Sequence, residues 1–236
     1  MPALERDEID VWIVDLAARD AGDITSARIL APAERERASR FKYEVDRSCF
    51  IQRRAALRMI LSEYLGVAPQ SIAFTENEFG KPSVVTPQAA AGLSFNASHS
   101  GTVAVIAVAR SGRVGVDVER LRPLVEAESI AARFLATGEA ATLAALHPHE
   151  RTEGFFNAWT RKEAVVKALG GGLSIPLDSF EVSLRPGEPP AILRWDIPEA
   201  AQTHWRIQDL DLPEDYVGAL VTDSGATVCR YQRWAG

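Results

Sequence analysis

Short apolar runs, some of them alternating with polar residues, recur along the chain and predict β-strands. The run VWIVDL at 11–16 alternates, whereas LSFNAS at 93–98 and TVAVIAVA at 102–109 are largely apolar, as in a buried strand. Glycine, proline and polar residues between the runs mark turns. The other predicted strands lie at 71–74, 114–119, 180–184, 191–197, 204–211, 216–222 and 227–232.

Longer segments repeat their apolar residues every three to four positions, which is the pattern of an amphipathic helix. The segment 47–65 is the clearest, and Gly66 follows it as a helix C-cap does. The segment 155–169 also predicts a helix, and it ends at the glycines 170–172. Shorter helices are predicted from Pro32, at 125–135 and at 138–146.

The order of these elements indicates the fold class. Strands and helices are mixed without the regular strand–helix–strand alternation of a parallel sheet, which favours an α+β fold. A strand, a helix and further strands follow one another twice, with a break near Ser111 and Gly112. We therefore expect two similar lobes, formed by residues 1–112 and 113–236.

Composition and charge narrow the possible partners and location. Of the 236 residues, 47% are hydrophobic and 25% are charged, as in a soluble globular protein. A net charge of −6 argues against a protein whose whole surface binds nucleic acid, but not against a local basic pocket for a phosphorylated ligand. The chain begins without a signal-peptide pattern, and its apolar runs are too short to span a bilayer. Because Cys49 and Cys229 form no CxxC pair, we expect a reduced cytoplasmic protein that binds neither nucleic acid nor a membrane.

Two carboxylates stand one residue apart at the end of the strand GVDVER. Asp117 and Glu119 point to the same side of that strand, so their charges repel each other unless a cation lies between them. One interpretation is a solvated strand end with Glu119 paired to a nearby arginine. The other is a site for Mg²⁺ or Mn²⁺, completed by water and a ligand phosphate.

The helix predicted at 155–169 carries a second set of functional groups. Trp159, Glu163 and Lys167 are spaced by four and share one face. That face could be an exposed glutamate–lysine pair, or it could be a pocket wall whose carboxylate meets Asp117 and Glu119. We expect Arg161 and Lys162 to point elsewhere, toward solvent or a partner.

Two turn motifs precede the carboxylates. In FNASHSG the residues Ser98 and His99 resemble parts of a serine hydrolase, but the GxSxG elbow is missing. A turn there is better suited to offer N–H groups, a hydroxyl and an imidazole to an anion, although it could also be a plain hairpin turn. In NEFGKP the flanking Gly80 and Pro82 would hold Lys81 in a fixed place.

Taken together, FGKP, FNASHSG, VGVDVER and WTRKEAVVKALGGGL resemble, in order and spacing, the 4′-phosphopantetheinyl transferases of the surfactin-synthetase-activating (Sfp-like) class. The resemblance implies two pseudo-twofold α+β lobes with coenzyme A and the active site in the cleft between them. It implies transfer of phosphopantetheine from coenzyme A to a serine of an apo acyl or peptidyl carrier protein, in fatty-acid, polyketide or nonribosomal-peptide synthesis. Adenosine 3′,5′-bisphosphate is released, Mg²⁺ (or Mn²⁺) is required, and the enzyme is a monomer.

The resemblance also implies roles for individual residues of the catalytic centre. The metal ligands would be Asp117, Glu119 and Glu163, and Glu163 would also be the base for the carrier serine. Lys167 and His99 would contact the phosphates.

The nucleotide end of coenzyme A has its own implied contacts. Ser98 would border the nucleotide, and Lys81 and Arg37 would receive the 3′-phosphate. The chain departs from the family at Glu34, where relatives carry a basic residue, so Arg54 or Arg58 could replace that contact.

Two other functions use the same groups. Clustered acids and a lysine also describe a metal-dependent phosphodiesterase or nuclease, although the chain has no basic stripe for nucleic acid. A coenzyme A-binding or carrier-docking module without catalysis is the second alternative, and the intact set of acids argues against it.

Overall fold

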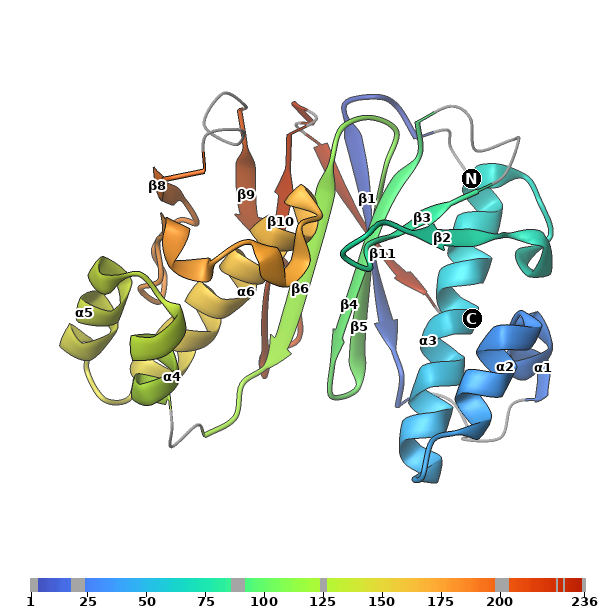
Figure 1. Ribbon diagram of the computed structural model, residues 1–236, viewed down its shortest axis with the longest axis horizontal. Coiled ribbons are helices and arrows are strands. Elements are labelled where there is room, and N and C mark those ends of the chain that lie inside the picture. Colours follow the sequence, from blue (N-terminus) through green and yellow to red (C-terminus); the bar gives the residue numbers. More distant parts are fainter. Residues whose placement is uncertain are drawn as a thin grey trace.

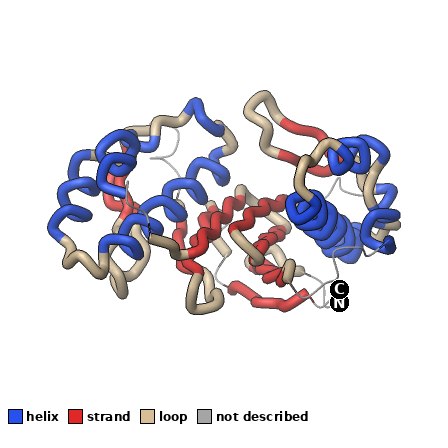
Figure 2. Tube along the Cα trace, turned by 90° about the horizontal axis from the view of Figure 1, so that it is seen from below, coloured by secondary structure: helices blue, strands red, loops and turns tan. Residues whose placement is uncertain are grey.

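The computed structural model describes residues 4–17, 24–85, 92–123, 127–197, 204–223, 225–226 and 228–234. Two lobes lie side by side, and each packs a long helix against a sheet (Figure 1). Seen from below, the strands occupy much of the middle of the molecule, and helices lie toward both ends (Figure 2). The expected α+β class with two similar lobes is confirmed.

The first lobe is built on a four-stranded sheet with the order β11-β1-β5-β4. The long helix α3 packs its buried apolar face on this sheet and ends at Gly66, whose φ of 65° suits glycine. The strands are β1 (Glu8–Asp15), β4 (Ser94–Ser100), β5 (Val103–Ala109) and β11 (Val228–Trp234), and a small hairpin joins β2 (Phe74–Glu76) to β3 (Pro82–Val84). The helices are α1 (Ile24–Ile29), α2 (Pro32–Ser39), α3 (Glu44–Leu65) and the short η1 (Pro69–Ser71).

The chain's last strand returns to the first lobe. β11 pairs in parallel with β1, while β5 pairs with the other edge of β1 in antiparallel. A division at residue 112 assigns β11 to the second lobe by sequence. In space, however, β11 is hydrogen-bonded to β1 of the first lobe.

The second lobe is built on the sheet β6-β10-β9. Its long helix α6 packs against β6 and β10 and ends at Gly170, whose φ is 79°. The strands are β6 (Val114–Arg120), β9 (Arg206–Asp209) and β10 (Tyr216–Thr222), with a hairpin of β7 (Phe180–Val182) and β8 (Ile192–Trp195). The helices are α4 (Ala127–Phe134), α5 (Thr137–Ala145), α6 (Arg151–Leu169), η3 (Gly172–Ser174) and η4 (Leu177–Ser179).

Helix α6 approaches β6 at Gly115 without space for a side chain. A Cβ at that position would lie 2.1 Å from the carbonyl oxygen of Ala164 and 2.4 Å from the nitrogen of Ala168. Glycine therefore permits the close contact between α6 and β6, the strand that carries Asp117 and Glu119.

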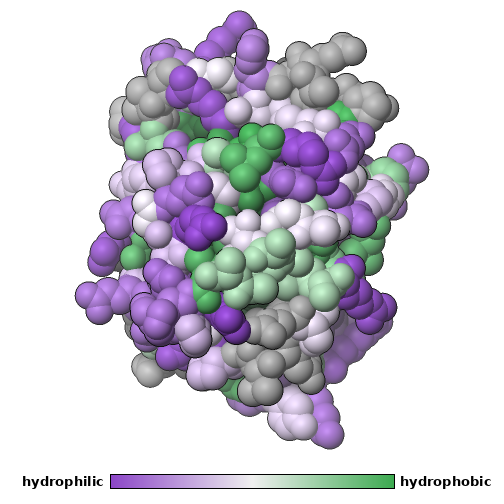
Figure 3. All heavy atoms as spheres, turned by 90° about the vertical axis from the view of Figure 1, so that its left-hand side faces the viewer, coloured by the Kyte–Doolittle hydropathy of each residue, from purple (hydrophilic) through white to green (hydrophobic). Residues whose placement is uncertain are grey.

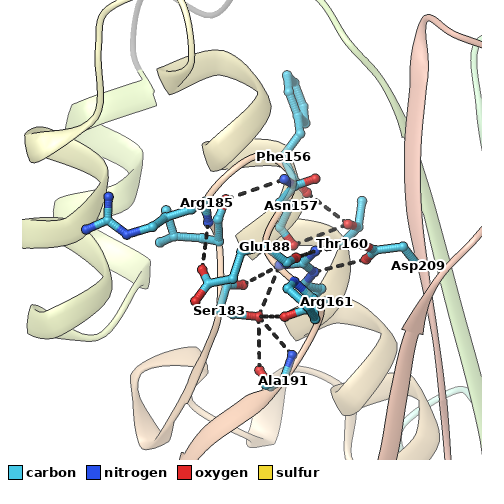
Figure 4. Close-up of polar contacts among 11 residues, drawn as sticks. Phe156, Asn157, Thr160, Arg161, Ser183, Arg185, Glu188, Ala191 and Asp209 are labelled. Atoms are coloured by element: carbon cyan, nitrogen blue, oxygen red, sulfur yellow. Dashed lines mark hydrogen bonds and ion pairs between the residues drawn. The ribbon is translucent and has the colours of Figure 1, made fainter.

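The prediction that Arg161 and Lys162 face solvent or a partner is wrong. Arg161 is 1% exposed; its guanidinium donates to the Ser183 carbonyl (2.7 Å) and pairs with Asp209 (2.8 Å) in the network drawn in Figure 4. Lys162 is fully buried and pairs with Glu139 at 2.8 Å. Both cations hold α6 to the elements around it, because the fold supplies acceptors that the sequence does not reveal.

The surface at the end of the second lobe is mostly hydrophilic, with apolar atoms gathered toward its middle (Figure 3). Among the helices of the described ranges, none is both long and apolar enough to cross a bilayer.

Candidate active site

The strands β4 and β6 lie side by side where the two lobes meet (Figure 1). They belong to different sheets, and side chains of β4 connect them. Asn96 Oδ1 accepts a hydrogen bond from the Val116 N–H, and the Ser98 hydroxyl donates to Asp117 Oδ1 at 2.7 Å. The Ser100 hydroxyl donates to Glu119 Oε2, also at 2.7 Å. Because alternate residues of a strand share a face, the segment NASHS positions both carboxylates of β6.

Asp117 lies at the centre of the site and is only 5% exposed. Its Oδ1 accepts from Ser98 and from Lys167 Nζ, which lies 2.6 Å away. Its Oδ2 is buried and has no hydrogen-bond partner among the described residues. Burial raises the pKa of Asp117, and the charge of Lys167 opposes that rise. A buried carboxylate oxygen without a partner is a position that a cation would satisfy.

Glu163 of helix α6 lies within electrostatic range of Asp117, and it shares a helix face with Trp159 and Lys167 as their four-residue spacing predicts. All three line one pocket of about 700 Å³. Burial raises the pKa of Glu163, and the negative charges of Asp117 and Glu119 raise it further. The three carboxylates are therefore close enough to influence one another.

The donor set suits a hard divalent cation, which prefers carboxylate oxygens. Within the described ranges, however, no three carboxylate, imidazole or thiolate groups form a ready-made metal cluster. Lys167 contacts the same oxygen of Asp117 as Ser98, so Oδ2 is the oxygen of this residue left for a cation.

A smaller pocket of about 230 Å³ adjoins the first across β4. Ala97 lines both pockets, and Ser98 and His99 line the smaller one. Partial burial and the charges of Arg53 and Lys167 lower the pKa of His99 to about 4, so its imidazole is neutral at pH 7. The remaining lining residues are Arg37, Phe50, Arg53, Arg54, Leu57, Ala104 and Ile106.

Lys81 lines the larger pocket, and its ammonium donates hydrogen bonds to the main chain of neighbouring elements. Nζ donates to the main-chain carbonyls of Val114 (3.2 Å) and Ala168 (3.1 Å). The neighbouring Asn77 donates to the Gly170 carbonyl and accepts the N–H of Lys81. Burial lowers the pKa of Lys81 to about 8. Two of the three N–H groups of Nζ are thus directed to main-chain carbonyls, and the expected role of Lys81 as a receiver of the 3′-phosphate stays a prediction.

Arg53 belongs to none of the four motifs, yet it lies in the smaller pocket beside His99. Its Nη1 lies 2.6 Å from His99 Nδ1, so helix α3 contacts the strand that positions Asp117. The signal available in the sequence was the doublet Arg53–Arg54 on an amphipathic helix, in which adjacent residues point in different directions.

Comparisons with known proteins agree on one family. Residues 113–221 match the 4′-phosphopantetheinyl transferase superfamily, and residues 22–111 match the model for the N-terminal part of a 4′-phosphopantetheinyl transferase. The 4′-phosphopantetheinyl transferase HetI of Nostoc sp. (strain PCC 7120) is 35% identical over 219 residues, 93% of this chain and 89% of the relative. The 4′-phosphopantetheinyl transferase Sfp of Bacillus subtilis (strain 168) is 35% identical over 66% of each chain.

Among solved structures, the holo-[acyl-carrier-protein] synthase of Thermotoga maritima is similar over 47% of this chain and 61% of its own. The TM-score is 0.36 and the sequence identity is 22%. None of these comparisons favours a nuclease, a phosphodiesterase or a module without catalysis.

Proposed function

The chain belongs to the 4′-phosphopantetheinyl transferase superfamily, and from that premise we propose that it transfers the phosphopantetheine group of coenzyme A to a serine of an apo acyl or peptidyl carrier protein. The observation that carries the proposal is the meeting of Asp117, Glu163 and Lys167 at the boundary of the lobes. The carboxylates can bind a cation and accept a proton, while the ammonium can neutralise a phosphate.

Glu163 is the general base in this proposal. The carrier serine oxygen attacks the phosphorus that bears the pantetheine arm, and its proton passes to a Glu163 carboxylate oxygen. The bond from that phosphorus to the bridging oxygen breaks, and adenosine 3′,5′-bisphosphate leaves. The raised pKa of Glu163 makes its carboxylate a stronger proton acceptor than an ordinary exposed glutamate.

Lys167 and His99 bind the pyrophosphate. Lys167 Nζ already lies between Ser98 Oγ (3.1 Å) and Asp117 Oδ1 (2.6 Å), so its position is set before the substrate arrives. A preorganised ammonium stabilises the negative charge that develops on the leaving phosphate. The neutral imidazole of His99 can donate a hydrogen bond without bringing a second positive charge beside Arg53.

The metal of this proposal is Mg²⁺, and Mn²⁺ can replace it because both prefer oxygen ligands. Asp117, Glu119 and Glu163 would hold it, and the open Oδ2 of Asp117 supports that assignment. When bound, the cation supplies further neutralisation of the pyrophosphate. Since all three carboxylates belong to one chain, we propose that a monomer can catalyse the transfer. We also propose that the enzyme acts in the cytoplasm.

Incubation with coenzyme A, Mg²⁺ and a panel of apo carrier proteins tests the function. We expect the mass of at least one carrier to rise by one phosphopantetheine group, and the modified residue to be a serine. Absence of any mass gain across acyl, polyketide and peptidyl carriers would reject the proposal.

A further inference from the structure

The turn between β2 and β3, residues 77–81, reaches from the first lobe to the C-terminal end of helix α6 in the second lobe (Figure 1). The Asn77 side chain closes this turn, because its Oδ1 accepts the main-chain N–H of Phe79 (3.0 Å) and of Lys81 (2.8 Å). Gly80 has a φ of 83°, which suits glycine. Lys81 therefore leaves the turn in a defined position.

Three main-chain carbonyls of the second lobe accept hydrogen bonds from this turn. Asn77 Nδ2 donates to the Gly170 carbonyl at 2.8 Å. Lys81 Nζ donates to the carbonyls of Ala168 at 3.1 Å and of Val114 at 3.2 Å. Ala168 belongs to the last turn of α6, where the carbonyls have no partner within the helix. The first lobe thus supplies a donor for one of these carbonyls and a cation at the negative end of the helix dipole.

The hydrogen bonds of Lys81 lie beside the close contact between α6 and β6. Val114 directly precedes Gly115, and a Cβ at Gly115 would lie 2.4 Å from the nitrogen of Ala168. One ammonium therefore joins the start of β6, the end of α6 and a turn of the other lobe. Because the ammonium is partly buried, these carbonyls replace water as its acceptors.

The same part of α6 carries the groups of the proposed mechanism. Lys167 directly precedes Ala168, and Glu163 lies one turn earlier on the same helix face. Phe79 and Lys81 of the turn line the larger pocket together with Glu163 and Lys167. A displacement of the last turn of α6 would therefore move the ammonium of Lys167 away from its partners on β4 and β6.

We propose that Asn77 and Lys81 are positioning residues of the transfer reaction: they cap the end of α6 from the opposite lobe and thereby hold Lys167 and Glu163 in place. The inference rests on the proposed function. In this role neither residue needs to touch the substrate, whereas the predicted contact of Lys81 with the 3′-phosphate is a binding role. The two roles of Lys81 give different kinetics.

The first test compares kcat and KM for coenzyme A and for 3′-dephospho-coenzyme A with one apo carrier. Lys81→Met keeps most of the length of the side chain but removes its donors. We expect kcat to fall by about tenfold with both substrates, because misplaced catalytic groups slow transfer whether or not the 3′-phosphate is present. An unchanged kcat would overturn the inference. A loss confined to coenzyme A would also overturn it, and would assign Lys81 to the 3′-phosphate.

Asn77→Ser tests the cap without changing the charge of the protein. A serine hydroxyl can still accept an N–H inside the turn, but it is too short to reach the Gly170 carbonyl. We expect a kcat about threefold lower with both substrates, the size of one lost hydrogen bond. Glu78→Gln changes an exposed residue of the same turn and should keep the wild-type kinetics. Wild-type kcat in Asn77→Ser would overturn the role of Asn77.

Hydrogen exchange, followed by NMR, examines the end of α6 without any transfer. The Gly170 N–H donates to the Val166 carbonyl at 2.8 Å and closes the last turn. In Lys81→Met and Asn77→Ser this amide should exchange about tenfold faster, while amides in the middle of α6 keep their rates. Wild-type exchange of the Gly170 amide in both variants would overturn the inference. Faster exchange in a protein that modifies no carrier would uphold the cap of α6 and reject the proposed function instead.

Discussion

Each lobe contains one long helix; the two helices pack in a similar way but present different chemical groups to the pockets. Helices α3 and α6 each pack on a sheet and each end at a glycine with positive φ. Helix α6 buries two cations that are satisfied by the fold and presents Glu163 and Lys167 to the larger pocket. Helix α3 presents Arg53, whose charge no acid matches among the described residues. In the proposed function this difference divides the work between the lobes: α6 supplies the carboxylate that would accept a proton, and α3 supplies positive charge beside the smaller pocket.

The largest effect is expected at the buried ion pair between Lys162 of α6 and Glu139 of α5. We expect Glu139→Gln to lower the free energy of unfolding by about 3–5 kcal/mol, because it leaves the fully buried Lys162 without its counter-charge. Urea denaturation measures the change. Glu36→Gln is the control: it removes an exposed partner of Arg40 and should cost at most about 1 kcal/mol. Equal costs would contradict a stabilising role for the buried pair.

The next largest effect on stability is expected at Gly115, where α6 packs on β6 without space for a side chain. Gly115→Ala places a Cβ within van der Waals overlap of the α6 main chain, and we expect a loss of about 3 kcal/mol in the free energy of unfolding. Gly187→Ala is the comparison, since Gly187 has a φ of 73° and open space around it. That variant should lose only about 1 kcal/mol, from backbone strain. A Gly115→Ala protein as stable as the wild type would show that α6 can move away from β6 at little cost.

The chemistry of α6 is tested by removing its base. Glu163→Gln should lower the transfer rate by about a hundredfold, equivalent to about 2.7 kcal/mol, because an amide cannot accept the serine proton. Binding of coenzyme A, measured by calorimetry, should change little. Glu153→Gln alters a glutamate in the first turn of the same helix and should leave transfer unchanged. Normal turnover in Glu163→Gln would assign the base to another group.

The positions of the two long helices could be predicted from local sequence. The apolar repeat and the following glycine predicted α3 and α6 to within a few residues, since both signals act over a single helical turn. The four-residue spacing correctly placed Trp159, Glu163 and Lys167 on one helix face, but it left open whether that face is exposed or lines a pocket, and the structure shows the pocket. The resemblance to a family then linked that wall to Asp117.

Long-range partners were not predictable in the same way. The pattern of 227–232 predicts a strand, but nothing in it indicates parallel pairing with β1 at the other end of the chain. Arg161 and Lys162 were expected at the surface because charged residues usually lie there, and the acceptors that bury them come from distant segments. In the doublet Arg53–Arg54 only Arg54 pairs with Glu34, and local sequence does not indicate which of the two is paired.

The smallest effect concerns the pKa of His99 on β4, which contacts Arg53 of α3. Because partial burial, Arg53 and Lys167 keep the pKa of His99 near 4, the unfolded chain takes up a proton at this residue first as the pH falls below 6.5. The contribution of His99 to stability therefore decreases between pH 6.5 and pH 4. Arg53→Gln removes one of the opposing charges and should raise the pKa of His99 toward 6.5, which narrows that window. NMR titration of the ring proton, assigned with a His99→Gln variant, measures the shift. Arg47→Gln should leave the pKa of His99 unchanged, and an equal shift in both variants would show that the net charge of α3 governs the imidazole, and that its direct contact with Arg53 does not.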